Sequence, residues 1–397
     1  MPVVTLSDLV FHVREISGGR SDLLTIREHG RRQPLSTADF LRGVHSLAVA
    51  LEARGLAQGD RVTIFFENRP EWHIVDFACQ LLGVTTVPVS PTLPEQQVGF
   101  ILRNSASGRV FYGNADQRDL LLGLVPSLTS PPEIVAVDGD AAGPEGISIT
   151  RLMGQGASLL GDVPIERFRG RAKAGDVASL VYVADASGDP SRIEMSHRQA
   201  VSDMLACAQT LDLSPADSAL AGLPLSLGFQ RTVDHQCFHR GIRVCYVPSL
   251  DDVPEALQHE RPTLLTAELG IYEWAYRQAL DRFPREKPLR RRALRWAVDI
   301  GRRHAAARGG FISPLLGLQR KLADRLIFRG CRQILGGRLR RALAGEAAAG
   351  ETPSAEESLA GEIRDFFAAL GVPLIRPHDF RSPPVEGTIV DASRTPR

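Results

Sequence analysis

The chain alternates between two hydrophobic patterns. Short runs of apolar and β-branched residues, such as Arg61–Phe66 and Thr85–Ser90, indicate buried strands. Between such runs, apolar residues recur every three or four positions, as at Phe40, Val44 and Leu47, and this spacing predicts helices with one buried face. Strands and helices in alternation predict an α/β fold with mainly parallel sheets, covered by helices on both faces.

The same alternation occurs twice along the chain. The stretch between the two occurrences is rich in Gly, Ala and Pro and has no clear periodicity, so we interpret it as a connection. The last 22 residues contain four prolines and no periodicity, which favours a tail. The predicted division is a lead-in (1–34), a first α/β subdomain (35–140), a connection (141–175), a second α/β subdomain (176–376) that includes a basic helical segment (281–341), and a tail (377–397).

Composition narrows the class of protein. With 397 residues, 43% of them hydrophobic and 23% charged, the chain can bury a large core and is not globally disordered. No run approaches the roughly 18 apolar residues of a membrane-spanning helix. The first residues lack the basic and apolar regions of a secretory signal, and the five scattered cysteines are typical of reduced thiols. We therefore expect a cytoplasmic protein, with peripheral membrane association as an open alternative.

The near-zero net charge conceals an asymmetry. Residues 281–341 hold 18 Lys/Arg and four Asp/Glu, a local balance of +14, whereas the rest of the chain carries −13. One interpretation is a solvated face whose apolar side, with Leu289, Trp296 and Ile300, packs inward. Another is a surface, within 289–341, for an anionic membrane or an acidic protein. No nucleic-acid-binding module surrounds the segment, so specific nucleic-acid binding is not predicted.

A small-residue loop follows the predicted strand Val177–Val183 and precedes a helix that Ser196 caps. Strand–loop–helix junctions suit anions, because free backbone N–H groups and the helix dipole point at the ligand. This loop, however, contains only one glycine, Gly188, no lysine, and the acids Asp185 and Asp189, which repel phosphate. On these residues alone, an ordinary surface loop is favoured.

Two further features have simple interpretations. His235 and His239 stand four residues apart on a predicted helix and could bind zinc, but no third ligand is near them in sequence. We therefore favour ordinary helix positions and predict no metal site. Cys245 lies in an apolar strand and is interpreted as a buried structural thiol.

Short motifs in a fixed order carry a family resemblance. In these motifs the chain resembles the N-terminal domain of the adenylate-forming enzymes (the AMP-dependent synthetase/ligase superfamily), and most closely long-chain fatty acid–CoA ligases, over most of residues 5–376. The resemblance implies two αβα subdomains, activation of a fatty acid through an acyl-adenylate, and ATP and Mg²⁺ as cofactors. The motifs include Gly59–Ile64, Glu67–Trp72, Val87–Leu93, Leu223–Ser226, Phe229–Asp234, Ser249–Pro254, Arg261–Thr263 and Leu335–Leu339.

The chain departs from the family pattern at the phosphate loop. The family reads T-S-G-T-T-G-x-P-K-G after a tyrosine, and here only Ser187, Gly188 and Pro190 still fit. These three residues are the remnant cofactor-binding positions that the resemblance implies. Ser191 stands at the lysine position, beside Arg192, so the phosphate-neutralising cation of the family is replaced.

Other motifs depart as well, and the chain ends before the family's hinge and its C-terminal lid domain with the catalytic lysine. We therefore expect weak or lost binding of ATP and Mg²⁺ and assign no catalytic residue. The departures are Leu227 for a histidine, Leu269-Gly270 for P-R, Ala344–Ala348 for S-G-G-A-P, and His378–Ser382 for Y-G-x-T-E with its magnesium-binding glutamate.

Three functional hypotheses remain open. The first is a degenerate, truncated acyl-CoA synthetase, a pseudoenzyme with weak or absent ligation. The second is a non-catalytic protein that binds fatty acid or acyl-CoA, or that regulates an active homologue. The third is one half of a split ligase whose lid is supplied by another chain.

Overall fold

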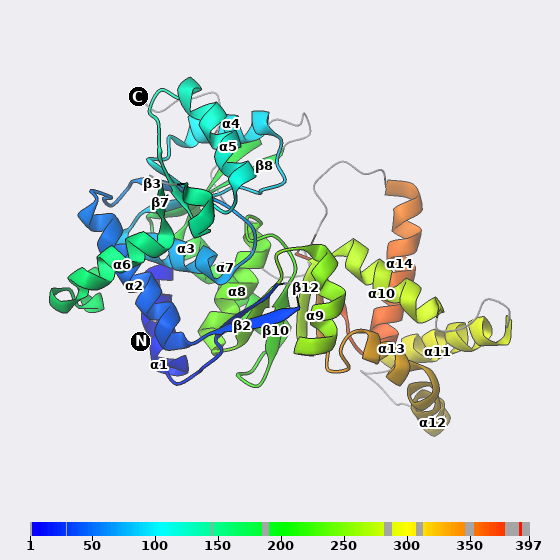
Figure 1. Cartoon of the computed structure of the whole chain (residues 1–397). Helices are drawn as coiled ribbons and strands as arrows, with labels where there is room; N and C mark the ends of the chain where they lie inside the picture. Colours follow the sequence, from blue (N-terminus) through cyan, green and yellow to red (C-terminus); the bar gives the residue numbers. More distant parts are fainter. Residues whose placement is uncertain are drawn as a thin grey trace.

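The computed structural model contains two twisted sheets with helices between and outside them (Figure 1). This arrangement confirms the predicted α/β class with mainly parallel strands. The structure describes residues 2–28, 30–143, 146–184, 190–281, 288–306, 313–345, 353–377 and 389–390.

The eight-stranded sheet has the order β15-β9-β8-β4-β3-β5-β6-β7. Its neighbours pair in parallel, except that β9 is antiparallel to both β8 and β15. The strands are β3 (Arg61–Phe65), β4 (Thr85–Pro88), β5 (Arg109–Tyr112), β6 (Glu133–Ala136), β7 (Ile147–Ser148), β8 (Val177–Ala184), β9 (Pro190–Ser196) and β15 (Ile389–Val390).

The seven-stranded sheet has the order β14-β13-β12-β10-β11-β1-β2. All neighbours pair in parallel except β2, which returns antiparallel to β1 at the edge. The strands are β1 (Leu24–Glu28), β2 (Arg31–Leu35), β10 (Ser218–Ala221), β11 (Arg243–Tyr246), β12 (Leu264–Glu268), β13 (Arg341–Gly345) and β14 (Leu374–Ile375).

Six helices belong to the core between the sheets, and the others pack outside. Figure 1 shows α8 in the centre of the molecule, with α4 and α5 at one end and α10 to α14 at the other. The helices of the middle core are α1 (Leu6–Ser17), α2 (Thr37–Ala53), α3 (Pro70–Leu82), α6 (Ile149–Leu159), α7 (His197–Leu211) and α8 (Gly228–Arg240). Those outside are α4 (Glu95–Ser105), α5 (Ala115–Leu124), α9 (Val253–Glu260), α10 (Leu269–Asp281), α11 (Pro288–Ala306), α12 (Pro314–Ala323), α13 (Arg329–Ile334) and α14 (Pro353–Leu370).

The central strands are apolar on both faces because each face meets helices. In β11, Val244 and Tyr246 point into the core between the sheets, whereas Cys245 points into the outer core. The alternation is that of a strand, whose successive side chains point to opposite faces. Cys245 is buried as a free thiol, as the sequence predicted.

The sheets do not follow the predicted subdomain boundaries. Strands β1 and β2 come from the predicted lead-in but pair with β11 of the second sheet. Strands β8 and β9 come from the predicted second subdomain but extend the first sheet through β4. The predicted connection contains α6, which packs on α2, and the predicted tail contains β15, which pairs with β9. Long-range pairing decides sheet membership, and local periodicity carries no information about it.

The basic segment is only partly packed. In α11, Ala297 and Ile300 are buried and Trp296 is half-buried against the outer core of the second sheet, as the inward-packing interpretation predicts. The leucines of α12 and of the following π-turn (Asp324–Phe328) instead face outward, with Leu318 and Leu326 each 65% exposed. Among the described residues, no helix is both long and apolar enough to cross a bilayer.

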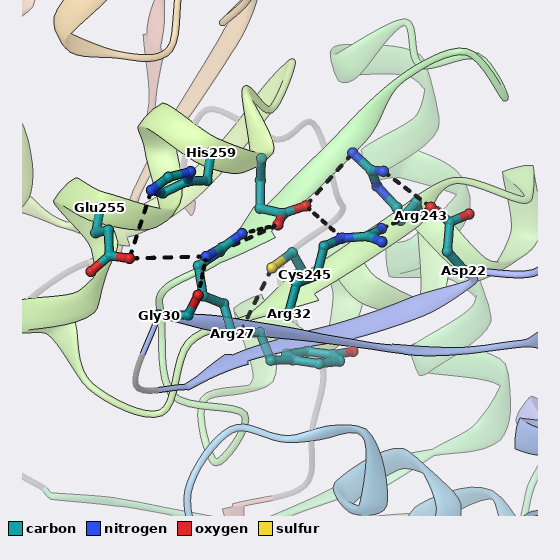
Figure 2. A network of polar contacts seen from close by, with 10 residues as sticks. Asp22, Arg27, Gly30, Arg32, Arg243, Cys245, Glu255 and His259 are labelled. Carbon is teal, nitrogen blue, oxygen red and sulfur yellow. Dashed lines mark hydrogen bonds and ion pairs between the residues drawn. The ribbon is translucent and has the colours of Figure 1, made fainter.

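The buried carboxylate of Glu260, at the end of α9, pairs with arginines of the edge hairpin β1–β2 and of β11. Oε1 of Glu260 accepts hydrogen bonds from Nη2 and Nε of Arg27 at 3.1 and 3.3 Å. Its Oε2 accepts one from Nε of Arg32 at 3.3 Å and lies 3.9 Å from Nη2 of Arg243. Asp22 accepts from Arg32 and Arg243 at 2.9 and 3.1 Å, so the three guanidinium groups converge between β1, β2 and β11 (Figure 2).

Removal of the central charge should destabilise the fold. The Glu260 side chain is only 4% exposed, so Glu260→Gln leaves Arg27 buried without its carboxylate. We expect a loss of about 3 kcal/mol in the free energy of unfolding, measured by urea denaturation. The matched control is Glu255→Gln, because Glu255 is 52% exposed and lies 3.9 Å from the same arginine. This control should cost less than about 1 kcal/mol. Equal losses for the two variants would contradict the role of Glu260.

Candidate functional site

The carboxyl ends of the two sheets meet at one asparagine. In open α/β sheets, ligands bind beyond the carboxyl ends of the strands. Asn68, just after β3, donates from Nδ2 to the carbonyl oxygen of Leu223 at 2.7 Å, and the N–H of Leu225 donates to its Oδ1 at 2.8 Å. Because Leu223 and Leu225 follow β10, these two bonds tie the end of β3 in one sheet to the end of β10 in the other.

Strand β13 ends at the same place. A Cβ atom on Gly345 would lie 2.5 Å from Cδ2 of Leu223, so the backbone after β13 lies directly against the segment after β10. We call the region formed by Asn68, Leu223, Leu225, Leu227 and Gly345 the carboxyl-end junction. It contains parts of two of the motifs that carry the family resemblance, Glu67–Trp72 and Leu223–Ser226.

Arg69, which follows Asn68 in the sequence, forms ion pairs with two carboxylates. Nη1 of Arg69 lies 2.6 Å from Oδ1 of Asp138, and its Nε lies 2.9 Å from Oε2 of Glu71. Burial alone would lower the pKa of Arg69, but these two carboxylates raise it above the usual value. Its charge therefore links the ends of β3 and β6 and is balanced there.

The loop predicted to hold phosphates joins two strands of a hairpin. Ser187 and Gly188 lie outside the described residues, and Pro190 begins β9. The sequence analysis missed β9 and expected the loop to continue to the helix, because the small and acidic residues there carry little strand propensity. The predicted cap is confirmed. Oγ of Ser196 accepts a hydrogen bond from the N–H of Gln199 at 3.2 Å, and α7 begins at the next residue.

Arg192, beside the lost lysine position, is buried and paired. Its side chain is 9% exposed, and its Nη2 lies 3.2 Å from Oε1 of Glu194. Both residues line a cavity of about 400 Å³ together with Arg61, Thr85 and Val177, the first residues of β3, β4 and β8. Arg192 is thus paired with Glu194 on this face of the hairpin.

The other departures lie where the resemblance places nucleotide motifs. Leu227 precedes α8, is 40% exposed, and makes no side-chain capping bond. Leu269 and Gly270 begin α10 after the carboxyl end of β12, and Ala344-Gly345 ends β13. None of these residues carries a charge. The remaining positions, 346–348 and 378–382, lie outside the described residues.

Sequence reasoning missed a polar cluster between α3 and α8. Nε2 of His73 lies 3.0 Å from Oδ2 of Asp234, and Nε2 of His235 lies 3.9 Å from Oδ2 of Asp76. All four side chains are buried. The signal that could have found it is a His and an Asp on each of two helices, three residues apart in α3 and adjacent in α8. The described residues do not place His239 in this cluster, and its ring stacks on His12 instead.

Burial shapes the acid–base behaviour of the cluster. Burial raises the pKa of Asp76, but the contact with His235 and the positive charge of Arg231 outweigh it and lower this pKa to about 2. Burial also lowers the pKa of His235 below its usual value. Asp76 is therefore ionised and His235 neutral at pH 7.

Comparison with known proteins gives the family. A family model described as AMP-binding enzyme matches residues 19–354. A long-chain-fatty-acid–CoA ligase of Mycobacterium bovis is 27% identical over 321 residues, which are 80% of this chain and 52% of that protein. A peroxisomal long chain acyl-CoA synthetase of Arabidopsis thaliana is 26% identical over 309 residues, 74% of this chain and 41% of that protein. The chain thus spans about half the length of the curated relatives it matches.

Solved structures share the fold at lower identity. A putative long-chain-fatty-acid CoA ligase from Rhodopseudomonas palustris superposes with a TM-score of 0.61 at 19% identity, over 93% of this chain and 74% of that one. A long-chain-fatty-acid-CoA ligase from Archaeoglobus fulgidus gives 0.65 at 13% identity, over 94% and 64%. The family model spans most of the sequence, and the protein therefore belongs to the AMP-binding enzymes.

Proposed function

We propose that this chain binds a fatty acyl ligand and, on its own, ligates it weakly or not at all. The observation that carries the proposal is the chemistry of the carboxyl ends. Uncharged Ser191, Leu227 and Leu269 stand where the family resemblance places motif residues, and the neighbouring Arg192 is paired with Glu194. Activation of a carboxylate by ATP needs cations on the leaving diphosphate. The acyl ligand is proposed because the curated relatives described above are named for long-chain fatty acids.

The exchange of pyrophosphate into ATP tests this proposal. Purified protein is incubated with labelled pyrophosphate, Mg-ATP and fatty acids of several chain lengths, beside a full-length ligase as the positive control. We expect no acid-dependent exchange, together with retention of fatty acid or acyl-CoA in equilibrium dialysis. Acid-dependent exchange by the chain alone would make it a ligase and overturn the proposal. Exchange that appears only after a lid-domain chain is added identifies one half of a split ligase.

Restoring the phosphate loop should not restore nucleotide binding. In the double variant Ser191→Lys and Asp185→Gly, the lysine and a glycine of the family loop return, but Leu227 and Leu269 remain. We expect less than a roughly tenfold gain in ATP affinity, or about 1.4 kcal/mol, in equilibrium dialysis. Ser158→Lys, an exposed serine of α6, controls for the added charge. A larger gain that the control does not share would show that the loop is the only defect.

A second proposal concerns a lipid surface on α12. Leu315, Leu318, Leu322 and Leu326 follow one another at spacings of three and four, and each is at least half exposed. This spacing puts them on one face of the helical run, which lies at the periphery of the molecule (Figure 1). Exposed cations lie beside these leucines, and an apolar stripe with flanking cations favours an anionic membrane over a neutral partner. The cations are Lys321, Arg325 and Arg329.

Sedimentation with liposomes tests the second proposal. The double variant Leu318→Ser and Leu322→Ser should lose most binding to vesicles that contain phosphatidylglycerol, and wild-type protein should release as salt rises, because screening acts over about 8 Å at physiological ionic strength. The control is Leu122→Ser and Leu159→Ser, which removes two leucines of similar exposure on α5 and α6. Equal sedimentation of both double variants would refute a role of the stripe.

A charge change in the neighbouring helix α11 tests the electrostatic part of the second proposal. The basic helix α11 contains Arg290, Arg291, Arg292 and Arg295. Changing all four to Glu should abolish sedimentation with anionic vesicles and leave the thermal midpoint nearly unchanged, since each basic residue near an anionic surface contributes about 1 kcal/mol. Sedimentation that is the same with neutral and anionic vesicles would contradict the electrostatic part of the proposal.

A further inference from the structure

Three side chains between α3 and α8 leave polar atoms without partners. They are Nδ1 of His73, Oδ2 of Asp76 and Nε2 of His235, and none of the three residues is more than 3% exposed. Buried polar atoms are almost always hydrogen-bonded, because an unpaired one loses its hydration without compensation. Three such atoms in one cluster therefore point to a group that binds among them.

The three residues form a ligand set. Each offers one ligand atom, and these atoms lie within 4.8 Å of one another. Two imidazoles and a carboxylate are typical ligands of Zn²⁺. Zinc bonds of about 2.0–2.2 Å place tetrahedral ligands roughly 3.3 Å apart, so the side chains must close by up to about 1.5 Å when the ion binds.

Outer contacts orient the two ligands of α3. Oδ2 of Asp234 accepts from Nε2 of His73 at 3.0 Å, which leaves Nδ1 of that ring with a lone pair. Asp234 is itself held by the hydroxyl of Tyr246 at 2.9 Å and Nε2 of Gln230 at 2.6 Å. Such a carboxylate behind a histidine is a recurring feature of zinc sites.

The carboxylate of Asp76 is held by one oxygen only. Its Oδ1 accepts from Nε2 of Gln80 and from Oγ1 of Thr86, both at 3.0 Å. Its Oδ2 accepts no hydrogen bond and lies 3.9 Å from Nε2 of His235. The pattern is that of a carboxylate positioned to bind a cation through a single oxygen.

Charge and space also suit a bound cation. The cluster holds two buried carboxylates, those of Asp76 and Asp234, and one buried guanidinium, that of Arg231. A cavity of about 10 Å³ beside His235, also lined by Arg231 and Thr232, has room for about one water.

We propose that His73, Asp76 and His235 form a buried Zn²⁺ site that joins α3 of the first sheet to α8 of the second. The site is structural, since its ligands lie inside the middle layer of helices. It is independent of the proposed acyl function. The histidine pair first noticed in the sequence contributes only His235 to it.

Metal analysis of zinc-loaded protein tests the proposal directly. Full-length protein is stripped with a chelator, incubated with zinc sulfate, desalted and analysed for metal. We expect about one zinc per chain and a rise of about 2–4 °C in the thermal midpoint. His73→Gln and His235→Gln should each bind zinc at least roughly tenfold more weakly. His239→Gln, on the same helix as His235, is the matched control and should keep full occupancy.

A second readout keeps the test decisive if a histidine variant does not fold. Wild-type protein loaded with Co²⁺ should show the visible absorption of a tetrahedral site with nitrogen and oxygen ligands. Folded wild-type protein that takes up neither metal would overturn the proposal and leave a proton as the balancing charge. Zinc retained in full by a folded His235→Gln variant would also overturn it.

Discussion

Two parallel sheets share a single layer of helices, and the rest of the structure depends on the burial that this imposes. α3 is buried along almost its whole length, and α8 along most of it, because each lies between two sheets. Every polar group in this layer must therefore find its partner inside it. At one end of α3, the side-chain amide of Asn68 finds its partners in the backbone after β10. These bonds join the two sheets where their strands end. The side chains of His73 and Asp234 pair with each other in the middle of the layer.

Much of the fold could be predicted from the sequence, because hydrophobic periodicity and the residues that begin and end helices are local features. The helix with Phe40, Val44 and Leu47 on one face appears where their spacing predicts it, and all three side chains are buried. Pairing between strands is not local, and for this reason periodicity could not show that β1 pairs with β11 or that β8 pairs with β4. At the site, the resemblance supplied the motif positions, but the ion pair of Arg192 with Glu194 and the crossing of α3 with α8 needed three-dimensional information.

The residues that build the scaffold and the residues that the resemblance assigns to nucleotide chemistry stand at different positions of this chain. In the motif Glu67–Trp72, Asn68 bonds twice to the backbone after β10 and Trp72 is buried. The positions that would contact a nucleotide in the family carry small or apolar residues instead, such as Ser191 and Leu227. A fold can persist without its activity because packing and catalysis rest on different residues. The match to the family model therefore establishes the family, and the activity of this chain remains a proposal.

The most direct test of the proposed weak nucleotide binding is a calorimetric titration of the purified chain with Mg-ATP at physiological salt. With the phosphate lysine replaced by Ser191 and the metal-binding glutamate by Ser382, a dissociation constant weaker than millimolar is expected, or about −4 kcal/mol at most. A dissociation constant near 10 μM, about −7 kcal/mol, would contradict the account, because it would mean that other residues supply the missing cations.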